Sequence, residues 1–211
     1  IDACLVGSEM CIRDRVITDS DEIFRHISDL GGEAFISTTN HDSGTDRVQE
    51  YAKTAGLEAQ EVVINVQGDE PLIDIEAVNQ LGDFMHANKY KYGTIAQHFS
   101  SNTDLLDPNK VKVVLNDDNS AIEFFRDAPI VVKDFSKVVL HHVGIYAYQV
   151  DFLHTFAGLS KTKNELNLKL EQMRALDNAL PLHVLELNLD ESWGIDTEED
   201  LIRLRKHLEL N

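Results

Sequence analysis

One compact run of apolar residues lies near the end of the first third of the chain. Residues 62–66 contain four β-branched apolar residues and one asparagine, a pattern that predicts a strand buried on both faces of a parallel sheet. Gly68 and Pro71 end the run and leave Gln67 and Asp69 at its carboxyl end. Ligands of open α/β sheets bind beyond such ends, and a carboxylate there can hold a divalent cation. An ordinary acidic turn is the alternative for this motif in isolation.

Predicted strands and helices alternate through the first half of the chain. Ser20 opens one helix, and Ser43 or Thr45 caps another whose N–H groups suit an anion. The expected strands are 16–19, 34–36, 62–66 and 93–99, and the expected helices begin at 20, 43–45 and 75. This alternation predicts an α/β fold with a mostly parallel central sheet and crossover helices.

The pattern changes after residue 110. Residues 111–115 and 122–125 flank a turn and predict a hairpin, and 138–148 predict a longer strand. We interpret these strands as a mixed extension of the sheet. Because 138–148 is more apolar than an exposed edge strand should be, we expect it to carry a dimer contact. Helices are expected at 150–157 and 164–179, then a strand at 182–187 and a capped helix from Thr197.

Composition narrows the possible partners. The chain has 211 residues, with 37 acidic and 19 basic side chains and a formal charge of −18. This charge disfavours binding to nucleic acid or to an anionic membrane, although a few cations and Mg²⁺ suffice for a small phosphorylated molecule. No apolar run is long enough to span a bilayer. We expect a soluble, cytoplasmic protein.

Residues 1–15 differ from the remainder. They hold both cysteines and show no sustained helical or strand period. Their core is similar to a peptide that recurs at the ends of unrelated predicted proteins, where it is taken as translated adapter sequence. We therefore expect residues 1–15 to be a non-native leader and 16–211 to form a single domain, with a divergent native segment as the alternative. Residues 16–211 contain no cysteine, so thiol chemistry is excluded there.

Six motifs occur in order along the chain. They are 42–47 (DSGTDR), 65–71 (NVQGDEP), 108–114 (PNKVKVV), 142–148 (HVGIYAY), 170–174 (LEQMR) and 194–201 (GIDTEEDL). This ordered set resembles that of the 3-deoxy-manno-octulosonate (Kdo) cytidylyltransferase family, also called CMP-Kdo synthetases. The resemblance runs from about Val16 to the last residue, and the ordered set is far more specific than any one motif.

The resemblance implies a Rossmann-like nucleotidyltransferase that joins CTP and Kdo into CMP-Kdo, releases pyrophosphate and feeds lipopolysaccharide synthesis. It implies that Asp69 and Asp196 are catalytic and together hold Mg²⁺. Two carboxylates from distant loops can fix a Mg²⁺ that also binds the attacking sugar oxygen and the α-phosphate. The metal would lower the pKa of the hydroxyl and align in-line attack.

The resemblance also implies the substrate-binding residues and the assembly. An arginine can clamp the sugar carboxylate, and the other side chains can bind its hydroxyls. The sugar pocket would be lined by Gln67, Arg126, His142, Tyr146, Glu171 and Gln172. The nucleotide side would include Ser43, Gly44 and Arg47. A homodimer is implied as well.

Two departures from the family pattern leave alternatives open. Phe125 and Asp127 flank Arg126 where the family has a serine and a small residue, which weakens the assignment of Arg126. The family's first strand and the loop that grips the triphosphate are absent from 16–211, which predicts low solubility or lost activity. The alternatives are a cytidylyltransferase for a related sugar acid, of the 8-amino-Kdo or sialic-acid type, and an inactive fragment that only binds ligand. A NAD-dependent dehydrogenase is disfavoured because no glycine-rich fingerprint is present.

Overall fold

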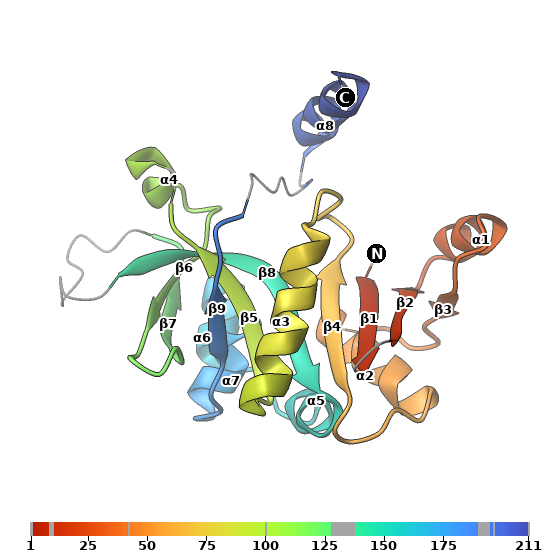
Figure 1. Cartoon of the computed structure of the whole chain (residues 1–211), viewed down its shortest axis with the longest axis horizontal. Coiled ribbons are helices and arrows are strands. Elements are labelled where there is room, and N and C mark those ends of the chain that lie inside the picture. Colours follow the sequence, from red (N-terminus) through yellow and green to blue (C-terminus); the bar gives the residue numbers. More distant parts are fainter. Residues whose placement is uncertain are drawn as a thin grey trace.

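The computed structural model describes residues 2–8, 11–41, 43–99, 101–127, 138–189, 195 and 197–210. A sheet of nine described strands forms the centre, with helices on both faces (Figure 1). The strands are β1 Asp2–Ser8, β2 Cys11–Thr18, β3 Ala34–Ile36, β4 Val62–Gln67, β5 Tyr92–Gln97, β6 Lys112–Leu115, β7 Ala121–Phe125, β8 Val139–Gln149 and β9 His183–Glu186. The helices are α1 Asp21–Asp29, α2 Gly44–Thr54, α3 Ile75–Asn88, α4 Asn102–Leu106, α5 Val150–Ala157, α6 Lys163–Leu168, α7 Met173–Asp177 and α8 Glu198–Leu210.

The strand order is β3-β2-β1-β4-β8-β5-β9, and β6 joins β8 and pairs with β7. The pairings β2–β3 and β5–β9 are parallel, whereas β1 and β8 run antiparallel to both of their neighbours in this order. Strands β2, β4 and β5 therefore point the same way, as the strand–helix alternation predicted. The alternation did not predict that β8 separates β4 from β5, so direct parallel pairing is rarer than expected.

The run 62–66 is buried on both faces, as predicted. Val62, Ile64 and Val66 pack with α3 on one face, in a cluster that includes Leu81. Val63 belongs to a second cluster on the other face, with residues of α2 and α5. Each face of β4 thus has its own hydrophobic core.

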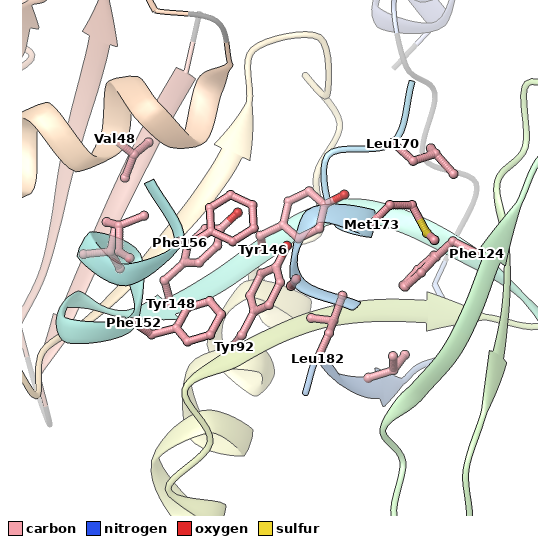
Figure 2. Close-up of a cluster of buried hydrophobic side chains, with 14 of the residues drawn as sticks. Val48, Tyr92, Phe124, Tyr146, Tyr148, Phe152, Phe156, Leu170, Met173 and Leu182 are labelled. Carbon is pink, nitrogen blue, oxygen red and sulfur yellow. The ribbon is translucent and has the colours of Figure 1, made fainter. Parts of the chain in front are cut away.

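The second core is rich in aromatic rings. Tyr92 stacks on Tyr148 with ring centroids 4.8 Å apart and on Phe152 at 5.1 Å. Figure 2 shows these rings gathered near Tyr146, with Phe124 and Met173 farther along the same cluster. Aromatic pairs of this kind contribute about 0.5–1.5 kcal/mol beyond the area they bury. The cluster anchors β5 and β8, which carry candidate site residues.

Capping residues in the sequence correctly predicted where α1, α2 and α8 begin. Ser20 caps α1 by accepting from the Ile23 N–H at 3.4 Å, and Ser43 caps α2 by accepting from Asp46 at 3.2 Å. At α8, the Thr197 hydroxyl accepts from the Asp200 N–H at 3.2 Å, while the Asp200 carboxylate accepts from the Thr197 N–H at 3.0 Å. This reciprocal pair is the predicted capping box. None of the described helices is both long and apolar enough to cross a membrane.

Two sequence-based expectations are wrong. The expected helix 164–179 is two helices, α6 and α7, because Lys169 takes a left-handed φ of 54° and ends α6. The segment 138–148 is not an edge, since β8 pairs with β4, β5 and β6, and its apolar character reflects burial within the sheet. Residues 1–15 show no sustained strand period in the sequence, and in the structure Asp2–Ser8 and Cys11–Thr18 form antiparallel strands. The foreign origin of 1–15 stays a prediction.

Candidate functional site

The first part of the candidate site lies at the carboxyl end of β4. Gln67 is the last residue of this strand, and Asp69 follows on an exposed turn. The Ile195 N–H donates to the Asp69 carbonyl oxygen over 2.8 Å, so two motifs 126 residues apart in sequence meet here. Asp196, the second predicted metal ligand, lies outside the described residues.

Asp69 is the described member of the predicted Mg²⁺ pair. Its backbone carbonyl accepts from Ile195, the residue before Asp196, and its carboxylate belongs to an exposed residue. Carboxylate oxygens are the ligands that Mg²⁺ prefers, so the available donors fit the ion. No cluster of three or more histidine, cysteine or acidic side chains suited to a metal occurs among the described residues. A site here would therefore rely on the two aspartates, substrate oxygens and water.

The second part of the site is built on β8. His142 and Tyr146 are buried with ring centroids 5.4 Å apart, and the Tyr146 hydroxyl donates to Gln172 Oε1 over 3.1 Å. Asn65 of β4 pairs with Tyr146 across the sheet, so Gln67, two residues on, shares its face. The structure thus brings together four residues predicted to line one pocket.

Three buried polar atoms near this face have no hydrogen-bond partner among the described residues. They are Asn65 Oδ1, Glu171 Oε1 and Gln172 Nε2. An unsatisfied buried polar atom costs about 1–3 kcal/mol, and such atoms usually have a functional reason. A ligand with several hydroxyl groups would satisfy both the acceptors and the amide donor.

Glu171 connects this group with the start of α2. The Thr45 hydroxyl donates to Glu171 Oε2 over 3.0 Å and lies 2.9 Å from the Tyr148 hydroxyl. Burial raises the pKa of Glu171, while the nearby hydroxyl groups of Ser43 and Thr45 and the charge of Arg174 oppose the rise. Thr45 is thus a buried contact to Glu171 and not the helix cap, which is Ser43.

Arg174 is a deeply buried charged side chain near the site, at 2% exposure. Its Nη2 lies 2.6 Å from Glu165 Oε1 and 3.8 Å from Glu171 Oε1, and its Nη1 lies 3.7 Å from Asp46 Oδ1. The guanidinium also lies over the Phe156 ring at 4.7 Å from the centroid. Sequence analysis quoted Arg174 within a motif but gave it no role. The paired carboxylates account for its burial.

The proposed nucleotide residues stand at the amino end of α2. The Ser43 hydroxyl donates to Asp46 Oδ2 over 2.8 Å in addition to its capping bond, and Gly44 begins the helix. Arg47 Nη2 donates to Asp19 Oδ2 over 2.8 Å. Both polar side chains are held by protein groups, and the positive end of the helix dipole lies beside them.

Arg126 has a role that the motif did not indicate. Its guanidinium donates to the Leu168 carbonyl at 2.9 Å and lies 3.4 Å from the Pro108 and Lys169 carbonyl oxygens. It therefore satisfies free carbonyl groups at the end of α6. Buried Lys112 in turn donates to the Arg126 carbonyl over 2.6 Å.

A cluster around Glu50 shapes the segment that leads into α2. The Glu50 carboxylate accepts from the hydroxyl groups of Ser37 and Thr38 and lies 2.6 Å from His41 Nε2. Burial raises the pKa of Glu50, but hydrogen bonds from Ser37, His41 and Thr38 outweigh this and bring it to about 2.

This low pKa predicts a pH-dependent stability contribution. Because the folded-state pKa of Glu50 lies below its ordinary value of 4.5, the contribution is present above pH 4.5 and is lost as pH falls toward 2. We expect Glu50→Gln to lower the free energy of unfolding by about 1 kcal/mol at pH 7, and by less at pH 4. Urea unfolding at both values measures this, and an equal difference at the two would contradict it.

The chain is similar in sequence to proteins of known family. A family profile described as cytidylyltransferase matches residues 8–184. The chain belongs to the cytidylyltransferase family. Among curated cytidylyltransferases, the 3-deoxy-manno-octulosonate cytidylyltransferase of Trichlorobacter lovleyi is 38% identical over 216 residues, covering 96% of this chain and 84% of the relative. The protein of the same name from Thermodesulfovibrio yellowstonii is 38% identical over 207 residues, covering 92% and 81%.

Solved structures agree with this membership. The structure of CMP:2-keto-3-deoxy-manno-octonic acid synthetase complexed with CTP has a TM-score of 0.83 and 30% identity, covering 93% of this cytidylyltransferase and 80% of that chain. A putative glucose-1-phosphate thymidylyltransferase from Bacillus anthracis has a TM-score of 0.57 and 14% identity, over 92% and 74% of the two chains, which supports the fold alone. The predicted α/β nucleotidyltransferase fold is confirmed.

Proposed function

We propose that this enzyme joins CTP to Kdo, giving CMP-Kdo and pyrophosphate for lipopolysaccharide synthesis. The arrangement around Tyr146 carries the proposal, because His142, Gln172 and Glu171 meet there. Their free acceptors and donor suit a sugar acid with many hydroxyl groups. The curated relatives that match 96% and 92% of this chain carry the matching name.

The reaction requires the sugar hydroxyl to attack the α-phosphorus of CTP in line with the departing pyrophosphate. We assign Asp69 and Asp196 to hold Mg²⁺, with Asp69 positioned by the backbone bond from Ile195. When bound, Mg²⁺ would lower the pKa of the attacking hydroxyl and offset charge on the phosphates. The protein contributes mainly by positioning both substrates.

We assign the sugar to the face formed by β4 and β8. Gln67, His142 and Tyr146 would bind hydroxyl groups. Burial lowers the pKa of His142 to about 3, so its ring is neutral at physiological pH and both donates and accepts. Glu171 and Gln172 would close the same pocket from the segment between α6 and α7.

The remaining assignments rest on the resemblance together with local geometry. Ser43, Gly44 and Arg47 would stand on the nucleotide side, where the amino end of α2 favours an anion. Arg126 would bind the sugar carboxylate only by exchanging its present carbonyl partners. We further propose a cytoplasmic homodimer. The homodimer rests on the resemblance alone, because β8 is not the exposed edge from which a dimer contact was expected.

A turnover assay separates this function from its alternatives. With CTP, Mg²⁺ and Kdo, we expect pyrophosphate release that EDTA abolishes and that needs the sugar acid. The values of kcat/KM for 8-amino-Kdo and N-acetylneuraminate should be at least about tenfold lower, since a site built for particular hydroxyl groups rejects analogues that leave its polar atoms unpaired. A higher value for either acid would identify a related sugar as the substrate.

Failure with every acid would favour the binding-only alternative. Calorimetric titration with CTP then decides whether the nucleotide still binds. Repeating the assay without residues 1–15 tests the expectation that this segment is foreign to the enzyme.

A further inference from the structure

A bulge in β8 lies beside the proposed sugar pocket. Thr94 of β5 pairs with Tyr146, but the next residue, Ile95, pairs with Val143. Strand β8 therefore holds two extra residues, 144–145, opposite a single step of β5. Bulges of this kind are common next to active sites, where they redirect side chains.

The bulge brings two predicted sugar-binding residues together. His142 and Tyr146 pair with Ala96 and Thr94, which are two residues apart on one face of β5. In a regular strand, the Cα atoms of residues four apart would be separated by about 13 Å, and side chains on one face would be spaced similarly. Here the rings of His142 and Tyr146 are 5.4 Å apart.

The Thr94 hydroxyl holds both the bulge and the histidine. It is buried and donates to the Ile145 carbonyl oxygen over 2.7 Å, with a second carbonyl oxygen, that of Val143, at 3.3 Å, and it lies 2.9 Å from His142 Nε2. A hydroxyl has one hydrogen to donate, and a carbonyl oxygen can only accept. With that hydrogen committed to Ile145, the contact to His142 requires a hydrogen on Nε2.

We infer that Thr94 is a positioning residue that fixes His142 as its Nε2–H tautomer and so leaves Nδ1 as the acceptor offered to a substrate hydroxyl. The tautomer is a property of the protein alone, whereas its use in sugar binding rests on the proposed function. The low pKa of His142, caused first by burial, agrees with a neutral ring.

The tautomer can be measured without substrate. In the full chain labelled with ¹⁵N-histidine, two-bond ¹H–¹⁵N spectra distinguish a protonated Nε2 from a protonated Nδ1, and His142→Gln assigns the signal among the nine histidines. We expect the Nε2–H form in the unaltered protein and in Thr94→Ser. In Thr94→Val we expect this pure form to be lost. An Nδ1–H tautomer in the unaltered protein, or an unchanged spectrum in Thr94→Val, would overturn the inference.

Kinetics test whether the tautomer matters for the sugar. Thr94→Val should raise KM for Kdo about tenfold with little change in KM for CTP, and Thr94→Ser should restore most of the loss. Thr155→Val, which removes an exposed hydroxyl bonded to the Asp151 carbonyl on α5, is the matched control and should leave both constants unchanged. If Thr94→Val does not fold, the unaltered protein and Thr94→Ser still give the tautomer.

These experiments distinguish a failure of the inference about Thr94 from a failure of the proposed function. Equal rises in both KM values, or no rise, with the expected tautomer would reject the role of Thr94 in sugar binding. The wrong tautomer would reject the inference while leaving the proposed reaction intact. Absence of turnover in the unaltered protein would reject the proposed function, and the spectra would still decide the tautomer.

Discussion

Asp69→Asn should reduce turnover of CTP and Kdo by at least about 100-fold at saturating Mg²⁺. The substitution keeps the size of the side chain but removes the charge proposed to hold the ion at the end of β4. Loss of an indirect contact to a metal already lowers affinity or activity by about 10–100-fold, so loss of a direct ligand should have the larger effect. Steady-state pyrophosphate release, measured over a range of Mg²⁺ concentrations, gives the result.

Asp83→Asn provides the matched control. Asp83 is exposed on α3, and its substitution removes the same charge at a residue outside the candidate site. It should leave turnover within about twofold of the unaltered enzyme, since isolated surface charges contribute little. Near-normal turnover of Asp69→Asn would exclude its role as a metal ligand. Asp196→Asn should match Asp69→Asn if the two act as a pair.

Arg174→Met should lower the free energy of unfolding by about 3–5 kcal/mol. The substitution fills a similar volume but leaves Glu165 buried without its bidentate partner and removes a cation close to Glu171 and Asp46. Breaking a buried ion pair by removing one partner has this large effect because an uncompensated charge remains inside the protein. Urea unfolding followed by circular dichroism measures the change.

A second substitution separates charge from packing. Removing both charges, in Glu165→Gln with Arg174→Met, should recover part of the loss, because no unpaired charge is then buried. Arg203→Met is the exposed control, since Arg203 pairs with Asp200 on α8 at 3.1 Å in solvent and should change stability by less than about 1 kcal/mol. A loss in Arg174→Met no larger than in the control would show that the buried network is not stabilising.

Much of the fold followed from local chemistry in the sequence. The β-branched run at 62–66, the caps at Ser20 and Ser43 and the turn between β6 and β7 act over a few residues, so periodicity and turn chemistry revealed them. The place of β8 could not be found in this way. Its apolar character indicated burial, but burial between β4 and β5 and burial at a dimer contact leave the same pattern.

The candidate site, like the fold, has features that the sequence predicted and features that it did not. The ordered motifs identified residues that the fold does bring together, including His142, Tyr146 and Gln172. They did not indicate the break at Lys169, because the leucine stripe continues through it and bonds from the distant Arg126 help to stabilise the break. Thr94 was missed for a related reason. A threonine in a buried strand looks like ordinary packing until the bulge opposite it is known.

The position of β8 also determines the order in which the enzyme can be completed during synthesis. Strands β4 and β5 leave the ribosome first. Neither can pair with β8, the strand that lies between them, until residues 139–149 have been made. At about 5–20 residues per second, the 41 residues between the end of β5 and the start of β8 take about 2–8 seconds. During that interval the edges of β4 and β5 that later face β8 stay open to wrong partners. The strand that closes them also carries His142 and Tyr146, so one step of synthesis joins the two halves of the sheet and supplies the first residues of the proposed sugar pocket, before β9 has been made.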